Sequence, residues 1–289
     1  FKEELLQCII EITTDVCDHI DDLSADLRPK LDMAIDYANK NDMELLSMPI
    51  HPFSRVSDQS VTNNNRYINF LDRMQWPLRR LLITGIHVHV GVPTGEMAIA
   101  VVNGMRRYIP HLIALSANSP YFESEGTGLA STRTKIFEGL PNTGIPVKLI
   151  NYGEFQKLIR TLVLAKSIDS IREIWWDIRP HPGYGTVEIR VCDTIPDLIN
   201  MRDLAAFIQA LVVGLCNHYD NGTQLPYLDS WIIHENKWRA TRYGLDAKLI
   251  MDDDGNEENI KSIIKNTIFA LEPEINDLKI GHAMDRLLE

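Results

Sequence analysis

The chain has 289 residues, of which 45% are hydrophobic and 24% charged, as is typical of a soluble globular protein. A net charge of −11, with no local run of Lys and Arg, argues against nucleic-acid binding through the phosphate backbone. Four cysteines without a CxxC pair predict reduced thiols in a cytoplasmic protein. The longest apolar run, 204–216, is interrupted by Gln209 and is too short for a membrane span, so it predicts a buried helix.

The chain begins without a methionine or a signal-peptide pattern, and we expect upstream residues to have been removed. Residues 5–14 are apolar and β-branched and predict a strand that carries Glu11. Residues 23–35 place an apolar side chain at every fourth position and predict a core-facing helix, with Pro29 at a kink or a second start. Residues 51–67 lack periodicity and predict a long loop.

A strand is predicted over Gly85–Gly91, where apolar and polar side chains alternate. Its three apolar residues would enter a core, while His87 and His89 would stand together on the opposite face. Two imidazoles are therefore aimed at one place.

Two later segments repeat this alternation. Asp177 and Arg179 form the polar row of 176–180, and Glu188 and Arg190 form that of 186–191. For each segment alone, the alternation is explained by an ordinary strand with one polar, half-exposed face. Together the three segments favour a functional site on one face of a sheet.

Between and after these strands, helices are predicted at 97–115, 154–166, 198–216, 229–242 and 257–271. The loop 116–133 is rich in small and hydroxyl residues and ends on Arg133; it could wrap a ligand or simply form turns. The strands and helices do not alternate regularly, and a turn at 181–185 joins two strands as in a hairpin, which predicts an α+β fold with a largely antiparallel sheet. Neither a GxGxxG nor a GxxxxGK[ST] motif is present, and without a repeat or linker one domain over 1–289 is the simplest interpretation.

A set of segments, in this order along the chain, resembles the type 2 glutamate-cysteine ligases, also called carboxylate-amine ligases. They are His51–Phe53, Gly85–Gly91, Ala114–Pro120, Thr127–Arg133, Trp176–Pro180, Gly185–Asp193 and Trp238–Gly244. The resemblance implies a glutamine synthetase/guanido kinase-like catalytic fold, in which a curved, largely antiparallel sheet has helices packed on one face.

The resemblance also implies a reaction, the ADP-forming ligation of a carboxylate to an amine through an acyl phosphate. ATP and Mg²⁺ (or Mn²⁺) are the implied cofactors, and glutamate with an amine such as cysteine are the implied substrates, giving a γ-glutamylcysteine-type product. Neither nucleic acid nor membrane is an expected partner. A homodimer is expected from the resemblance alone.

Residue roles follow from the same resemblance. Glu11 matches a metal-binding glutamate, with Glu4 at the acidic position seven residues earlier, and Glu188 matches a further metal carboxylate. His87 matches the histidine of a Gly-x-His motif near the nucleotide and metals, with His89 as its strand neighbour. Structural alternatives are that Glu4 is simply solvated and that His89 only forms a hydrogen bond.

Three arginines are the implied anion-binding groups. Arg190 would meet the negative charge that develops on phosphate, and Arg133 and Arg179 would hold a phosphate or the substrate carboxylate, because guanidinium binds both in a bidentate manner. Arg179 could instead pair with Asp177. We therefore predict Arg190, Glu188 and Arg133 as catalytic, and His87, His89, Arg190 and Arg179 as nucleotide-binding.

The sequence also departs from the family pattern. The Gly-x-Glu-x-Glu strand that supplies further metal carboxylates is absent, so the N-terminal strand or strands of the catalytic domain are expected to be missing, and residues 46–50 stand where relatives are glycine-rich. Two other functions stay open on the residues. One is a zinc hydrolase that uses His87 and His89. The other is a non-catalytic binding protein on the same fold.

Overall fold

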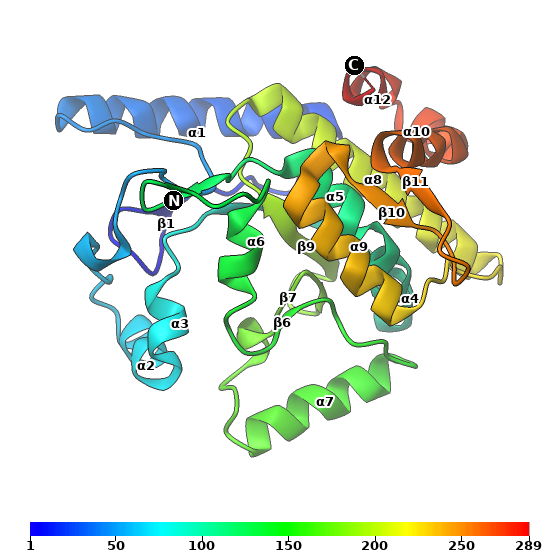
Figure 1. Cartoon of the computed structure of the whole chain (residues 1–289), viewed down its shortest axis with the longest axis horizontal. Helices are drawn as coiled ribbons and strands as arrows, with labels where there is room; N and C mark the ends of the chain where they lie inside the picture. The colour runs from blue at the N-terminus through cyan, green and yellow to red at the C-terminus, as the bar shows by residue number, and fades with distance from the viewer. Residues whose placement is uncertain (289) are drawn as a thin grey trace.

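The computed structural model describes residues 1–288 and shows α-helices packed against a central antiparallel sheet (Figure 1). The α-helices are α1 (Ile20–Lys40), α2 (Asn65–Met74), α3 (Trp76–Arg79), α4 (Gly95–Met105), α5 (Ile109–Ser116), α6 (Thr132–Phe137), α7 (Tyr152–Leu164), α8 (Leu198–Asp220), α9 (Ser230–Tyr243), α10 (Ile260–Ala270), α11 (Glu272–Leu278) and α12 (Gly281–Leu287).

The central sheet has the order β3-β9-β8, and both of its strand pairs are antiparallel. Its strands are β3 (Gly85–Gly91), β8 (Ile178–His181) and β9 (Thr186–Asp193). Short pairs complete the described strands: β1 (Lys2–Glu3) with β2 (Ile10–Glu11), β4 (Tyr121–Phe122) with β5 (Glu125–Gly126), β10 (Lys248–Ile250) with β11 (Glu257–Asn259), and the parallel pair β6 (Thr143–Gly144) and β7 (Trp175–Trp176). The predicted α+β class is confirmed.

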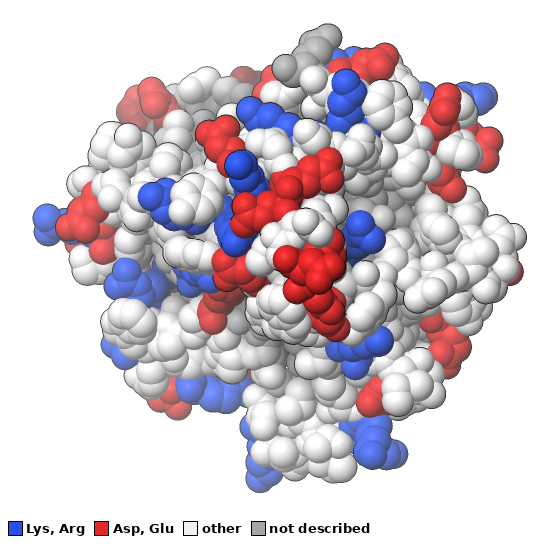
Figure 2. All heavy atoms as spheres, turned by 45° about the vertical axis from the view of Figure 1, so that its right-hand side comes forward, with Lys and Arg blue, Asp and Glu red and all other residues white. Residues whose placement is uncertain are grey.

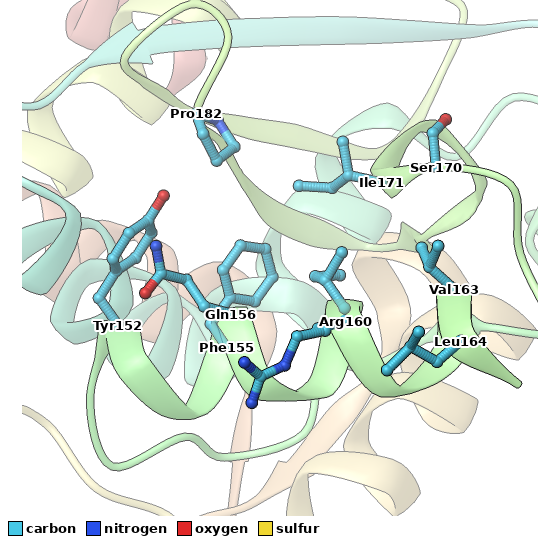
Figure 3. A pocket seen from close by; sticks show the side chains of 10 residues that line it. Tyr152, Phe155, Gln156, Arg160, Val163, Leu164, Ser170, Ile171 and Pro182 are labelled. Carbon is cyan, nitrogen blue, oxygen red and sulfur yellow. The ribbon is translucent and has the colours of Figure 1, made fainter.

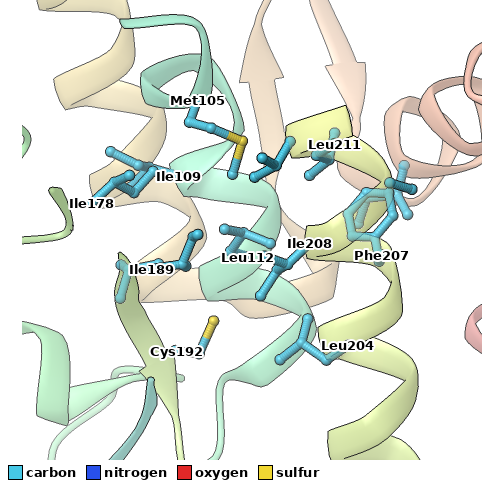
Figure 4. Close-up of a cluster of buried hydrophobic side chains, with 14 of the residues drawn as sticks. Met105, Ile109, Leu112, Ile178, Ile189, Cys192, Leu204, Phe207, Ile208 and Leu211 are labelled. Carbon is cyan, nitrogen blue, oxygen red and sulfur yellow. The ribbon is translucent and has the colours of Figure 1, made fainter. Parts of the chain in front are cut away.

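One face of the central sheet forms the main core. The alternating apolar residues of β9 point into it, and both Val187 and Ile189 are fully buried. Figure 4 shows Leu112 of α5 between Ile189 on one side and Ile208 of α8 on the other. Complete burial of an Ile or Leu side chain stabilises the fold by about 1.5–3 kcal/mol, so this row fixes which face of each strand is polar.

The helix α8 runs through the core. By length and composition it is apolar enough to cross a membrane, but 67% of its apolar window is buried inside the protein. The Asp197 side chain caps its first turn by accepting from the amide of Asn200, and Gly104 of α4 packs so close that a Cβ there would lie 2.6 Å from Leu215. We therefore interpret α8 as a core helix, as the apolar run over residues 204–216 predicted.

The predicted helix over 97–115 is divided into α4 and α5 by a 3₁₀ turn at Arg106–Tyr108. Pro110 explains the division, because proline has no amide proton to continue the α-helical ladder and suits the first turn of a new helix. In α1, by contrast, the helix continues past Pro29 to Lys40.

The prediction of one strand over residues 5–14 is wrong. The chain turns back after Leu6, where the Gln7 amide donates to the carbonyl of Ser60 and the Ile9 amide to that of Leu6. Leu6 is buried whereas Ile10 is 47% exposed, so the run does not present one continuous apolar face. The predicted loop over 51–67 is largely irregular, although α2 begins within it at Asn65.

Candidate active site

A row of charged and imidazole side chains lies on the face of the central sheet opposite the core. In the strand register His89 of β3 and Arg179 of β8 both pair with Glu188 of β9, so Glu188 stands in the middle of the row. A register irregularity between Ile86 and Val88 places His87 opposite the next polar residue of β9, Arg190, in the space between two regular pairs. The three polar strand rows predicted from the sequence do share one face.

Glu188 holds this row together. Its side chain is buried, and one carboxylate oxygen, Oε2, accepts from Nε of Arg179 at 2.6 Å. The other oxygen, Oε1, accepts from Nη1 of Arg190 and lies 3.8 Å from Nδ1 of His87 and 3.7 Å from Nε2 of His89. One buried acid therefore organises two arginines and two histidines.

The protonation states follow from this arrangement. Burial raises the pKa of Glu188, but the charges of Arg190 and Arg179 outweigh burial and hold that pKa well below its usual range. Loss of hydration and the charge of Arg190 lower the pKa of His87 well below its usual value, against the opposing effect of Glu188. Loss of hydration likewise lowers the pKa of His89. At neutral pH the row thus combines an ionised acid, two cations and two neutral imidazoles.

Arg179 is largely committed to protein groups. Besides Glu188, it donates from Nη1 to the carbonyls of Ile171 at 3.1 Å and Ile174 at 2.6 Å. Asp177 is not its partner, since that carboxylate binds Nζ of Lys237 on α9 at 2.6 Å. The alternative of an Asp177–Arg179 pair is wrong, and Arg179 anchors the segment before β7 as well as Glu188.

Arg133 has a similar structural environment. It lies over Gly85, where an added Cβ would meet its Nη2 at 2.2 Å, and it donates to the backbone carbonyls of Arg190 and Val191 at 3.1 Å each. Only 4% of the residue is exposed. Arg133 thus supports the backbone that carries Arg190, and its predicted role as an anion ligand stays a prediction.

The hydroxyl-rich loop before Arg133 wraps a protein carboxylate. Asp193, at the end of β9, is fully buried and accepts from the hydroxyls of Ser119 at 2.7 Å and Ser131 at 2.9 Å, and from the amide of Asn118 at 3.0 Å. The sequence left open whether this loop wraps a ligand or simply forms turns, and in the structure its hydroxyls and an amide hold the protein's own Asp193.

Arg190 is the cation of this row with the clearest unmet hydrogen-bonding capacity. Its Nη1 binds Glu188 and lies 3.5 Å from Nδ1 of His87, while its Nε is buried without a hydrogen-bond partner among residues 1–288. A guanidinium held by one acid, with a donor still unused, is suited to an incoming oxyanion. Arg133 also has a buried Nε without a partner among residues 1–288, but both of its Nη atoms donate to backbone carbonyls. The guanidinium of Arg190 has no such backbone contact in the described chain, which supports its predicted role more directly than those of Arg133 and Arg179.

Glu4 and Glu11 form a second acidic group. Burial and the neighbouring charge of Glu11 raise the pKa of Glu4, and Lys2 pairs with Glu11 at 2.7 Å. Lys2 is also close enough to Tyr184 for the phenol to affect its pKa, and the ring of Tyr184 is 5.5 Å from that of His89. The β1–β2 pair therefore neighbours the row, although within residues 1–288 the hydrogen-bond and ion-pair partners of Glu188 are Arg179, Arg190, His87 and His89.

Only part of the predicted metal-ligand set fits a divalent cation. Two adjacent carboxylates, with the pKa of Glu4 raised, suit a hard cation such as Mg²⁺, which prefers oxygen ligands. Both oxygens of Glu188, however, are engaged by arginines, so direct metal binding there requires Arg179 or Arg190 to move. Within residues 1–288 no three His, Cys, Asp or Glu side chains are grouped as for a metal ion, and the ligand set Glu4, Glu11, His87 and Glu188 stays a prediction.

Two residues of the site were missed by the sequence reasoning. The ring of His181 stacks on that of Tyr184 with centroids 4.4 Å apart, and it meets the ring of His89 edge-on at 5.3 Å. Loss of hydration lowers the pKa of His181, so this ring too is neutral at pH 7. The sequence did contain an indication of this, because His181, the first residue of the turn His181–Gly185, continues the polar alternation of β8.

An open, mostly apolar groove of about 420 Å³ borders this end of the sheet (Figure 3). Figure 3 shows α7, with Tyr152 and Phe155, forming one wall, while Pro182 from the turn after β8 faces it across the groove. Ile171, another lining residue, also supplies a carbonyl to Arg179. The groove thus offers apolar surface next to the charged row.

Comparisons with known proteins converge on one family. The model of glutamate-cysteine ligase family 2 matches residues 1–287. "Putative glutamate--cysteine ligase 2-1" of Frankia casuarinae is 42% identical over 94% of this chain and 71% of its own length, and "Putative glutamate--cysteine ligase 2" of Thermobifida fusca is 39% identical over 100% and 72%.

The fold also resembles a solved structure. A glutamate–cysteine ligase from Francisella tularensis, crystallised in complex with AMP, superposes with a TM-score of 0.59 at 15% identity over 84% of this chain. This chain covers 65% of that protein, which is less than two thirds of its length. At this identity the likeness concerns the fold, and it agrees with the α+β architecture described above.

Proposed function

Because the chain belongs to the glutamate-cysteine ligase family 2, as its sequence predicted, we propose that it contributes the catalytic site of an ATP-dependent, ADP-forming carboxylate-amine ligase. Glutamate and an amine such as cysteine are the proposed substrates, with a γ-glutamylcysteine-type product. The family match supports the ligase class, and the AMP complex of the fold neighbour shows that a protein of this fold binds an adenine nucleotide.

The reaction explains the kind of site that is needed. A carboxylate does not condense with an amine in water, so its oxygen first attacks the γ-phosphorus of ATP and ADP leaves. The amine nitrogen then attacks the acyl carbon and forms the C–N bond. The C–O bond breaks, inorganic phosphate leaves with that oxygen, and the amine loses a proton. Both steps depend on positioning and on compensation of negative charge.

The row on the central sheet supplies these functions. Arg190 binds an oxygen of the transferring phosphoryl group, while Glu188 fixes the orientation of its guanidinium. The neutral rings of His87 and His89 provide one donor and one acceptor each without adding charge. Arg179 and Arg133 hold the surrounding backbone in place.

Glu4 and Glu11 are the proposed ligands for Mg²⁺ in the described part of the chain. Such a cation, when bound, neutralises phosphate oxygens during phosphoryl transfer. The pair is suited to this because burial, together with the neighbouring charge of Glu11, raises the pKa of Glu4, and a bound cation would offset both effects. The observation that carries the whole proposal is the buried Glu188 between Arg179 and Arg190, in a chain of this family.

Release of ADP is the direct test. The chain, together with any natural flanking sequence, is incubated with ATP and Mg²⁺, and ADP is measured with glutamate alone, with amine alone and with both. A ligase predicts ADP that requires both substrates and a dipeptide formed in equal amount. ADP release that ignores the amine contradicts the proposal.

The same assay separates the ligase from both alternatives, because neither of them releases ADP. A zinc hydrolase at His87 and His89 cleaves its substrate without ATP, and a non-catalytic protein on this fold releases no ADP. Two further expectations stay proposals: a cytoplasmic location, compatible with four free cysteines among the described residues, and a homodimer.

A further inference from the structure

A second cavity of about 380 Å³ lies among the helices that cover the core face of the sheet. Its lining comes from the end of α4, the following 3₁₀ turn, Lys148, the segment 224–228 before α9, and Ile233 on α9. The described lining residues thus include none from β3, β8 or β9. Glu188 and its partners stand on the opposite face of that sheet, so this cavity is separate from the candidate active site.

Arg106 is the unusual residue of this cavity. It is 5% exposed, and its guanidinium donates from Nη2 to the hydroxyl of Ser230 at 2.7 Å. Its Nε is buried with no hydrogen-bond partner, and no carboxylate lies within ion-pair distance, as far as residues 1–288 are concerned. Buried guanidinium groups normally have an acidic partner, so this one is suited to an anion from outside the described chain.

Two further cations line the same cavity. Arg107 follows directly in the 3₁₀ turn, and Nζ of Lys148 lies 4.5 Å from the ring centroid of Tyr227. Neither takes part in an ion pair within the described part of the chain. The overall charge is −11, and Figure 2 shows acidic side chains gathered near the middle of one face, so three cations at one cavity stand out from the general composition.

We propose that this cavity binds a small molecule through an oxyanion, a phosphate or a carboxylate. The oxyanion is held by Arg106 at the buried end and by Arg107 and Lys148. Leu225, Pro226 and Tyr227 add an apolar wall, and the volume is within the usual range of small-molecule sites.

Acidic groups near the cavity limit what it accepts. The hydroxyl of Tyr227 donates to Oδ1 of Asp229 at 2.8 Å, and Asp253 is near enough to affect the pKa of that phenol. A second anionic group near Tyr227 would meet these carboxylates. The cavity therefore favours a ligand with its oxyanion at one end and an uncharged, apolar or aromatic part at the other.

Isothermal titration calorimetry tests the proposal without ATP or amino acids. Inorganic phosphate, phenyl phosphate and benzoate are titrated at ionic strength matched with chloride, and the two aromatic anions distinguish phosphate from carboxylate recognition. The test variant is the double change R107Q/K148Q, which leaves buried Arg106 in place. The control K157Q/K265Q removes two exposed cations elsewhere.

The proposal predicts saturable binding of at least one aromatic anion, tighter than that of inorganic phosphate, and at least tenfold weaker binding in R107Q/K148Q with no change in K157Q/K265Q. Equal binding in wild type and R107Q/K148Q overturns it, as does an absence of saturable binding. Binding lost in R190K but kept in R107Q/K148Q assigns the anion to the sheet face instead. Light scattering on R107Q/K148Q provides a further check. If the double change alters the molar mass of the protein but not its ligand binding, the cavity is a contact with a second copy of the chain, and the proposal is also overturned.

Discussion

Replacement of Glu188 by Gln removes the one charge around which the sheet face is organised. Gln has nearly the same shape and keeps a carbonyl oxygen, but it carries no negative charge and its amide nitrogen would face a guanidinium. In the wild type Glu188 is 2% exposed and binds Arg179 at 2.6 Å as well as Arg190. The change therefore leaves two neighbouring cations without their shared acid.

The expected loss of stability follows from this burial. Breaking a buried ion pair costs about 3–5 kcal/mol, and the retained acceptor offsets part of that, so we expect about 2–4 kcal/mol for E188Q. A chain of this size loses roughly 2 °C of melting temperature per kcal/mol, which corresponds to about 4–8 °C. Since domains have about 5–15 kcal/mol of stability, the variant still folds at 25 °C.

The pH dependence of unfolding identifies the cause. The pKa of Glu188 is depressed in the folded state, so its contribution is present above its unfolded value of about 4.3 and is lost as the pH falls further. Urea denaturation is therefore measured from pH 7 to pH 3.5 for both proteins. The gap between wild type and E188Q should be widest near pH 7 and should narrow below about pH 4.5.

A matched control removes the charge of an exposed glutamate that also pairs with an arginine. Glu235 pairs with Arg239 at 3.1 Å, but its side chain is 45% exposed, so E235Q should cost at most about 1 kcal/mol. ADP release should fall by more than a hundredfold in E188Q and stay unchanged in E235Q. Equal melting temperatures and equal ADP release for E188Q and the wild type would refute the reasoning.

Further predictions concern neighbouring groups. R190K should lower ADP release at least tenfold with a small change in melting temperature, because an ammonium cannot replace a planar guanidinium; equal rates would contradict phosphate binding by Arg190. G85A should lower the melting temperature by several degrees, since its Cβ would meet Arg133 at 2.2 Å, whereas G91A on the same strand has open space and should change little. E11Q should raise the Mg²⁺ concentration for half-maximal ADP release at least tenfold, and an unchanged requirement would remove Glu11 from the metal site.

Period-two alternation predicted the polar face of the sheet correctly, because the apolar row of each strand must enter the core. It could not predict which polar groups would pair. Asp177 binds Lys237, which is 60 positions away on a helix, and Arg179 therefore turns to Glu188. Such choices depend on how helices pack on the sheet, which a local pattern does not contain.

The misplaced strand over residues 5–14 has a similar cause. Its β-branched composition favours extended backbone, but the bridge between Leu6 and Val61 and the turn after it are set by a segment more than fifty residues later. Glu4 and Glu11 were nevertheless brought together, because the turn folds β2 back onto β1. The two glutamates thus lie together although the predicted strand is wrong, and their metal-binding role stays a prediction.

The three arginines show that residue type alone does not identify which side chain is available to bind an anion. The sequence predicted all three of Arg133, Arg179 and Arg190 as anion-binding groups, since each lies in a motif segment. Their surroundings separate them: Arg133 and Arg179 donate to backbone carbonyls, whereas the guanidinium of Arg190 is held only by side chains within residues 1–288. A buried Nε without a partner in the described chain is common to Arg133 and Arg190.

The most direct test of the central claim follows one oxygen atom. Glutamate labelled with ¹⁸O in its γ-carboxylate is incubated with ATP, Mg²⁺ and the amine, and the inorganic phosphate is analysed by mass spectrometry. Ligation through an acyl phosphate on this sheet face predicts one ¹⁸O in each phosphate released, with both product and label lost in E188Q. Unlabelled phosphate, or label transfer that persists at the wild-type rate in E188Q, would contradict the account.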